Sequence, residues 1–255
     1  METATKEGKY IYCIIKIKEP RNFGPLGIGG RADELHAICY DGIAAVVSNS
    51  PIITYSVSRE NMISHEKAIE EVMKEYTVLP VRFATIAKDE EKVKQILRKE
   101  GGKFRDLLDK FNGKKELGLK AIFKETLIYQ DILKRYENIK ELKEKIAALP
   151  VDKTYFHRME IGRMVEDALE KEKEICKESI LNTLHPLAED VKINASYGER
   201  MIINAAFLVD EEKEAEFDQK VQQLHGAYSD MVKFKYIGVI PPFNFVNLSI
   251  ETGQY

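Results

Sequence analysis

The sequence has few of the residues that build disulfide frameworks or metal centres. Its three cysteines, Cys13, Cys39 and Cys176, stand far apart and form no C-x-x-C pair. This spacing favours a protein of the reducing cytoplasm, without disulfides. None of the five histidines lies at helical spacing from another. Because a metal centre needs several converging ligands, we predict no metal site.

A strong charge of one sign and a long apolar run are also missing. The formal net charge is −3, and 32% of the residues are charged. This balance gives no overall electrostatic attraction to nucleic acid or to an anionic membrane. No apolar run approaches the ~20 residues that span a bilayer, and the opening METATKEGK lacks the apolar core of a secretory signal. We therefore expect a soluble cytoplasmic protein with no nucleic-acid or membrane partner.

Reactive motifs are equally scarce. The sequence contains no G-x-S-x-G segment, no Walker A lysine and no evident pair of catalytic carboxylates. Gly27–Ala32 spells G-x-G-x-x-A, but it does not directly follow a predicted strand, and a strand rather than a helix comes after it. The context of a dinucleotide-binding fingerprint is therefore absent, and a connecting loop is the better interpretation. We predict no catalytic residue, no cofactor and no enzymatic activity.

The chain does contain enough apolar residues for two domains, since 44% of its 255 residues are hydrophobic. In the first half, Tyr10–Ile17 is a short apolar run typical of a central strand. Asp41-Gly42, between two strand-like runs, predicts a hairpin with a type I′ turn. The other expected elements are a helix from Ser58 to about Tyr76, a strand at Val78–Ile86, and helical pieces at Glu90–Lys99 and Phe104–Phe111.

In the second half, a strand at Leu117–Phe123 is followed by apolar residues at helical spacing up to Pro150, and a second helix extends from Asp152 to about His185. The apolar side of the second helix is marked by Phe156, Met159, Met164, Ala168, Ile175, Ile180 and Leu184. Two such helices joined by a short turn predict an antiparallel helical hairpin over residues 126–184. The elements expected after it are strands at Val191–Tyr197 and Met201–Val209, a helix from Asp210 to about Gly226, and a strand at Met231–Gly238.

The order of these elements predicts an α+β protein of two domains. The second domain is expected over residues 114–255. Within it, residues 117–239 read β-α-β-β-α-β, the ferredoxin-like order, with the first helix expanded into the hairpin, and a Pro-rich C-terminal strap begins at Pro241. Residues 1–113 follow a variant of the same ferredoxin-like plan, in which the Gly-rich loop replaces the first crossover helix.

Two segments supply the candidate site residues. Within Tyr76–Thr85, Pro80 indicates an edge strand or bulge, and Arg82 stands between apolar residues, where its charge needs a partner. Arg82 has either a functional role or a structural salt bridge to Glu66 or Glu70. In the strap, Pro241-Pro242 predicts an extended chain that presents Phe243 and Phe245, either to the core or to a docking partner. The partner-binding candidates are Arg82, Pro241, Pro242, Phe243 and Phe245.

Several segments together resemble one family, the gas vesicle proteins L and F (GvpL/GvpF). The most specific is Thr77–Thr85, T-V-L-P-V-R-F-A-T. The others are Gly27-Ile28-Gly29-Gly30, Gly42–Ser48, His65, Gly113–Lys120, Ala206–Asp210 and the closing Gly238–Val246. The sequence departs from the family at Ala84, where a Gly is usual, and at Phe243, where the closing motif has Tyr.

The resemblance implies a minor structural or assembly accessory protein of the gas vesicle, the hollow shell that gives prokaryotic cells buoyancy. It implies two α+β domains with a helical or coiled-coil element, and association with the small shell protein GvpA, with other vesicle accessory proteins and with itself. It supplies no catalytic residues. From the residues alone, two alternatives stay open: a small-ligand sensor without a vesicle role, and an enzyme with an unusual site at Arg82 and His65. Because a general base needs an acid or nucleophile beside it, His65 is better interpreted as a hydrogen-bonded packing residue.

Overall fold

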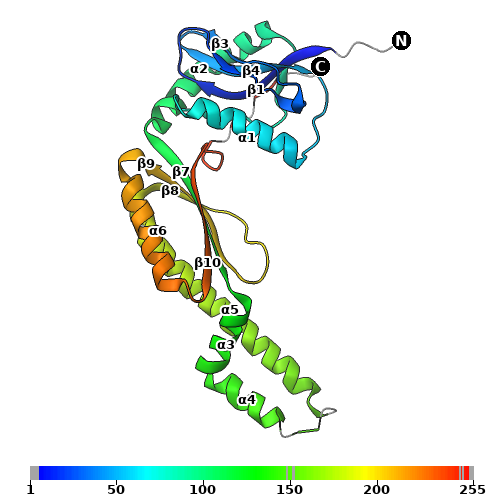
Figure 1. The fold of residues 1–255 in the computed structure, drawn as a ribbon, viewed down its shortest axis with the longest axis vertical. Coiled ribbons are helices and arrows are strands. Elements are labelled where there is room, and N and C mark those ends of the chain that lie inside the picture. Colours follow the sequence, from blue (N-terminus) through cyan, green and yellow to red (C-terminus); the bar gives the residue numbers. More distant parts are fainter. Residues whose placement is uncertain (1–5, 148, 151–152, 247, 249, 253–255) are drawn as a thin grey trace, which may run out of the picture. The chain divides into compact units, whose positions relative to one another are not determined.

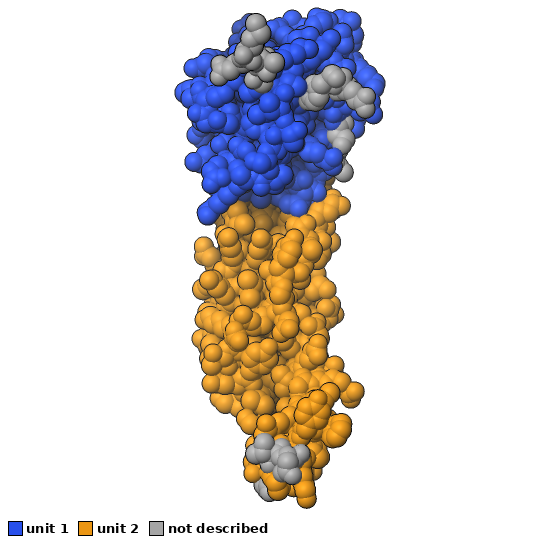
Figure 2. Space-filling model, turned by 90° about the vertical axis from the view of Figure 1, so that its right-hand side faces the viewer, with its two compact units in different colours: residues 1–116, 239–255 blue, residues 117–238 orange. Residues whose placement is uncertain are grey.

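The structure is a computed structural model that describes residues 6–147, 149–150, 153–246, 248 and 250–252. The chain divides into two compact units (Figure 2). The first contains the residues up to Glu116 together with those from Val239 onward, and the second contains Leu117–Gly238. Among the described residues, no helix is both long enough and apolar enough to traverse a bilayer.

The first unit is built on a six-stranded sheet around the apolar strand β1 (Figure 1). The strand path is β2-β3-β4-β1-β5, and β6 also pairs with β1. The bounds are β1 Glu7–Ile15, β2 Asn22–Gly24, β3 Leu35–Tyr40, β4 Ile43–Pro51, β5 Leu79–Pro80 and β6 Ile86–Ala87, with the short 3-10 helix η1 at Ile28–Gly30. The pairs β1–β4, β1–β5, β1–β6, β2–β3 and β3–β4 are all antiparallel.

The predicted hairpin turn is confirmed. Tyr40 pairs with Ile43, so that β3 and β4 are joined by Asp41 and Gly42 alone. Both turn residues have positive φ angles, +47° and +80°. A type I′ turn requires this geometry, which Asp-Gly adopts at little cost.

Two helices pack on this sheet, and each begins at the predicted capping residue. Helix α1 spans Arg59–Met73, and the hydroxyl of Ser58 accepts the Asn61 N–H at its start. Helix α2 spans Glu90–Phe111 and is capped in the same way by Asp89. Both helices contact β1, in which every residue from Tyr10 to Ile15 is buried. Because successive strand residues point to opposite faces, both faces of β1 are covered.

The prediction of two separate helical pieces within α2 was wrong. The helix continues through Gly101 and Gly102. Each glycine costs about 1 kcal/mol relative to alanine, but the buried residues on either side keep one helical face in register. Those residues are Val93, Ile96, Leu97, Phe104, Leu108 and Phe111. Burial of this face outweighs the tendency of the two glycines to interrupt the helix.

The predicted Val78–Ile86 strand is interrupted. Strands β5 and β6 are separated by residues 81–85, which stay beside β1 through the bonds Val81 N–H to Tyr12 O and Ile11 N–H to Thr85 O. Within this stretch Ala84 has a φ of +61°, a left-handed conformation that breaks strand geometry. Pro80 lies in the last strand of the path, where its missing N–H is tolerated.

In its described residues, the second unit combines a four-stranded sheet of order β10-β7-β9-β8 with four α-helices. The strands are β7 Lys114–Phe123, β8 Ala188–Ile193, β9 Met201–Asp210 and β10 Val232–Ile240. The helices are α3 Glu125–Arg135, α4 Glu137–Ala147, α5 Tyr155–Leu184 and α6 Glu214–Tyr228, with 3-10 turns η3 at His185–Leu187 and η4 at Glu211–Lys213. Strands β8 and β9 are antiparallel, and α5 packs on β9 and on α6. The prediction of an α+β protein with two sheets is confirmed.

The helical hairpin differs from its prediction in its first arm, which is two helices rather than one. Helices α3 and α4 are separated at Tyr136, whose backbone is extended (φ −93°, ψ 92°). Contacts with α5 hold this bend. The Tyr136 hydroxyl donates to Glu172 at 2.9 Å, and Arg135 forms ion pairs with Glu172 and Asp131. The 30-residue helix α5 contacts both α3 and α4.

The expected apolar side of α5 is only partly covered. Ala168, Ile180 and Leu184 are buried, but Phe156 is 81% exposed and Ile175 is 52% exposed. The apolar periodicity predicted the helix correctly. It did not reveal that α3 and α4 leave part of this side open to solvent.

The boundary between the units also differs from the predicted division into residues 1–113 and 114–255. The C-terminal strap packs with the first unit rather than the second. The backbone N–H of Asn244 donates to the buried Glu116 carboxylate at 3.0 Å, and its side-chain amide donates to the other carboxylate oxygen. Leu248, 4% exposed, forms a parallel bridge with Val81. These contacts join sequence-distant segments, so local patterns carried no sign of them.

Candidate partner-binding site

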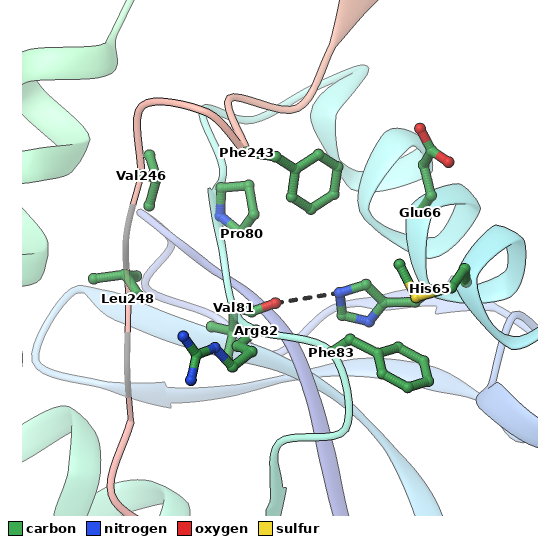
Figure 3. A pocket seen from close by; sticks show the side chains of 10 residues that line it. His65, Glu66, Pro80, Val81, Arg82, Phe83, Phe243, Val246 and Leu248 are labelled. Carbon is green, nitrogen blue, oxygen red and sulfur yellow. Dashed lines mark hydrogen bonds between the residues drawn. The ribbon is translucent and has the colours of Figure 1, made fainter. Parts of the chain in front are cut away.

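A cavity of about 440 Å³ lies between α1, the segment after β5 and the C-terminal strap (Figure 3). We call it the strap cavity. Its lining residues are Met62, His65, Glu66, Pro80, Val81, Arg82, Phe83, Phe243, Val246 and Leu248. The lining is mostly apolar, with one carboxylate and one guanidinium.

Helix α1 supplies one wall, because Met62, His65 and Glu66 lie at i, i+3 and i+4 on the same face. Met62 is 41% exposed, whereas His65 is 3% exposed. Burial raises the pKa of the Glu66 carboxyl, and the nearby Glu70 carboxylate raises it further. The wall is therefore apolar at one end and carries an acid at the other.

His65 is held as a neutral packing residue. Its Nε2 lies 3.2 Å from the carbonyl oxygen of Val81, which can only accept, so Nε2 carries the proton. Its Nδ1 then accepts from the Tyr10 hydroxyl at 3.1 Å, and that hydroxyl accepts the Ala84 N–H at 2.9 Å. Burial lowers the pKa of His65 to about 4. Both ring nitrogens are occupied, and they fix the segment that carries Arg82.

Arg82 does not occupy the buried position that its apolar neighbours predicted. Its side chain is exposed, and within the described residues it forms no ion pair with Glu66 or Glu70. The structural salt bridge considered from the sequence was therefore wrong. The physical reason is the break in the strand at residues 81–85, where the Arg82 carbonyl accepts the Thr85 hydroxyl at 2.7 Å. Arg82 lines the strap cavity with its charge unpaired by the described residues.

The strap forms a turn rather than the predicted extended chain. The carbonyl of Pro242 accepts the N–H groups of Phe245 and Val246 at 3.1 and 2.9 Å. Pro241 and Pro242 are buried, and Phe245 is half-buried outside the cavity lining. Phe243 is 38% exposed and lines the cavity. Of the five predicted partner-binding residues, the structure thus brings Arg82 and Phe243 together, and the two prolines instead anchor the turn.

Sequence reasoning missed Glu116 as the residue that holds the strap. Its side chain is fully buried, and burial raises its pKa although both Asn244 hydrogen bonds lower it. A lone acid at the start of a predicted apolar strand was the available signal, but nothing in the sequence identified Asn244 as its partner. Within the described residues, no group of three or more His, Cys, Asp or Glu side chains could hold a metal ion.

The fold is that of an α+β protein with two sheets, and its first unit carries a largely apolar cavity. The chain belongs to the GvpL/GvpF family, because the family model "Gas vesicle synthesis protein GvpL/GvpF" matches residues 8–247. The family expected from the motifs is thereby confirmed. It is a family of gas vesicle structural proteins, not of enzymes.

Individual relatives match over almost their whole length. Gas vesicle protein F of Nostoc sp. is 28% identical over 95% of this chain and 99% of its own. Gas vesicle protein F1 of Halobacterium salinarum is 26% identical over 97% of both. The crystal structure of GvpF from Anabaena sp. PCC7120 superposes with a TM-score of 0.81 at 27% identity, covering 95% of this chain and 99% of that one. GvpF from Microcystis aeruginosa gives a TM-score of 0.75 at 26% identity, covering 94% and 99%.

Proposed function

We propose that the chain is a minor structural or assembly accessory protein of gas vesicles, which binds the small shell protein GvpA and other vesicle proteins during vesicle formation. Its site of action is then the cytoplasm and the growing vesicle. Membership of the GvpL/GvpF family supports the vesicle role. The strap cavity is the observation that supports binding, because two of its apolar lining residues, Met62 and Phe243, are exposed to solvent.

The rim of the cavity, formed by Met62 and Phe243, is apolar and open to a partner. Met62 and Phe243 both line the cavity, and they are 41% and 38% exposed. A shell subunit that polymerises through apolar surfaces needs those surfaces shielded beforehand. An apolar side chain of such a subunit can enter the cavity, with Glu66 and Arg82 available to polar groups beside it.

The direct test is co-purification with the shell protein from vesicle-forming cells. Phe243→Ala and Met62→Ala each remove apolar contact area from the rim, and we expect each to weaken shell-protein binding by about tenfold, or roughly 1–2 kcal/mol. The matched control is Tyr197→Ala, which removes an aromatic side chain that is 74% exposed in the second unit. Thermal melts separate lost binding from lost folding.

One result would contradict the proposed docking site, and another would contradict the proposed role in vesicle formation. If both rim variants fold and bind the shell protein as well as the Tyr197→Ala control, the strap cavity is not the docking site. If deletion of the gene leaves vesicle number and size unchanged, the chain has no role in vesicle formation.

A small-ligand role is a second candidate, because 440 Å³ lies within the range of ligand pockets. A ligand of this kind would raise the melting temperature of the wild-type protein and not that of a Met62→Trp variant, in which the larger ring fills the opening. Melting curves that no metabolite of a broad panel shifts would exclude this role.

We also propose that both units follow the ferredoxin-like plan and that α5 forms a short coiled-coil hairpin with α3 and α4. The strand order β10-β7-β9-β8 supports the plan in the second unit. The path β3-β4-β1-β5 supports the same order in the first, with β2 added at its edge.

A further inference from the structure

The helical part of the second unit carries a furrow, separate from the strap cavity, with apolar side chains in its middle and charged side chains toward its ends. Three adjoining cavities of about 370, 430 and 360 Å³ share lining residues. Leu133 and Lys143 line the first and second, and Tyr129 and Val165 line the first and third. We call the combined surface the hairpin furrow. Its apolar lining is formed by Tyr129, Leu133, Ile146, Ile161, Val165 and Leu169.

The spacing of these residues gives the furrow a helical repeat. On α5, Arg158, Ile161, Val165 and Leu169 follow one another at intervals of three or four residues, and on α3 Tyr129 and Leu133 are four apart. They therefore form a straight seam on each helix. At about 1.5 Å of rise per residue, the seam from Arg158 to Leu169 is about 17 Å long. That is the length of a helix of about 11 residues.

Charge is separated along the furrow. One end carries the cations Lys134, Lys140, Lys143 and Arg158 with a single acid, Glu144. The other end carries Glu166, Glu170 and Glu199. Within the described residues Lys143, Arg158 and Glu166 form no ion pair, whereas Glu170 pairs with Lys173 at 2.7 Å. Both ends thus retain charges that the unit itself does not neutralise.

We propose that the hairpin furrow binds an amphipathic helix of a partner protein. The apolar face of that helix lies on the seam, its acidic residues face Lys143 and Arg158, and its basic residues face Glu166 and Glu199. Helix-in-groove binding uses apolar anchors at the same i, i+3 and i+4 spacing. The proposal concerns a surface separate from the strap cavity and does not depend on the identity of the shell protein.

The opposite charges at the two ends of the furrow favour a helix over other occupants. A fatty carboxylate would satisfy only the basic end and would leave its chain beside the acids of the other end. A helix of matching length places opposite charges at both ends at once. Each exposed pair contributes only about 0.2–1 kcal/mol, so the apolar seam supplies affinity and the charges select the occupant.

The test uses three synthetic 14-residue peptides that share one leucine face. The bipolar peptide carries Glu near one end and Lys near the other, and the two controls carry only Glu or only Lys at both ends. Fluorescence anisotropy with the full chain measures their affinities. We expect the bipolar peptide to bind several-fold more tightly than either control.

Variants of the chain then locate the binding. The double variant Lys143→Glu/Arg158→Glu should weaken the bipolar peptide by about tenfold and strengthen the all-Lys peptide. The control Lys233→Glu/Lys235→Glu makes the same charge change on β10, outside the furrow, and should leave both affinities unchanged. Circular dichroism melts verify that both variants fold.

Three results overturn the proposal. In the first, the bipolar peptide binds no better than the all-Lys peptide, or the β10 control loses as much affinity as the furrow variant. In the second, laurate binds with the same dependence on Lys143 and Arg158 while the bipolar peptide does not. In the third, the wild type is a dimer in sedimentation and the furrow variant is a monomer, which makes a second copy the occupant.

Discussion

The environment of His65 predicts how the stability of the protein depends on pH. Burial lowers the pKa of the folded imidazole to about 4, from an ordinary value of 6.5 in the unfolded chain. Between these values the unfolded state binds a proton that the folded state does not. The free energy of unfolding therefore falls as the pH drops from about 6.5 toward about 4, and His65 has no such effect above that window.

The size of this effect follows from the difference between the pKa of 6.5 in the unfolded chain and the pKa of about 4 in the folded protein, because each pKa unit corresponds to about 1.36 kcal/mol. Between about pH 7.5 and pH 4.5, His65 should cost the folded state roughly 2–3 kcal/mol. The structural origin is the burial of the ring, because a charged imidazole would lose its hydration there, and the hydrogen bond to the Val81 carbonyl only partly opposes this effect.

The experiment compares the wild type with His65→Gln by urea denaturation across this range. Glutamine can donate to the Val81 carbonyl and accept from Tyr10, but it does not titrate. On acidification, the free energy of unfolding of the wild type should therefore fall by about 2–3 kcal/mol relative to that of the variant. His185→Gln, at an exposed histidine, is the matched control and should track the wild type. NMR titration of the His65 ring gives the folded pKa directly.

A wild-type-to-variant difference that stays constant from pH 7.5 to 4.5 would refute this reasoning. So would a ring titration near 6.5, because it would show that burial does not hold the imidazole in its neutral form.

Two further predictions concern the segments around the strap cavity. Ala84→Gly should raise the free energy of unfolding by about 0.5–1 kcal/mol, because glycine adopts the +61° φ without the steric cost that alanine meets; urea denaturation measures this, and a loss of stability would contradict it. Asn244→Ala should lower it by about 2–3 kcal/mol at pH 7, because the buried Glu116 carboxylate loses two donors. The pKa of Glu116 is already raised by burial, and acidification neutralises its carboxyl, so the loss of stability caused by Asn244→Ala should be smaller at acidic pH than at pH 7. Urea denaturation at pH 7 and at an acidic pH tests this. An equal loss of stability at the two pH values would contradict it.

Local chemistry predicted the elements whose cause lies within a few residues. Asp41-Gly42 determines a turn through its own backbone preferences, and Ser58 and Asp89 cap helices through side chains that reach the next turn. The interpretation of His65 as a hydrogen-bonded packing residue also agrees with its observed bonds. In each case the relevant physical chemistry is visible in a short window of sequence.

Nonlocal contacts account for the predictions that failed. The exposure of Arg82 depends on how residues 81–85 pass beside β1, and the turn of the strap depends on a contact between Asn244 and Glu116. Apolar periodicity correctly placed Phe156 on a helix, but whether another element covers that ring is a property of the whole unit. The residues of the strap cavity were therefore predicted in part, and their arrangement was not.

The contact between Glu116 and Asn244 has a consequence for how the protein is made. The first unit is discontinuous, because its sheet is encoded before Leu117 and its last segment after Gly238. A ribosome adds roughly 5–20 residues per second. Glu116 is therefore synthesised several seconds before Asn244, which donates hydrogen bonds to its carboxylate. A premature stop codon just after Ile240 would therefore remove the strap and damage the unit that was mostly synthesised first, whereas every strand and helix of the second unit would still be encoded.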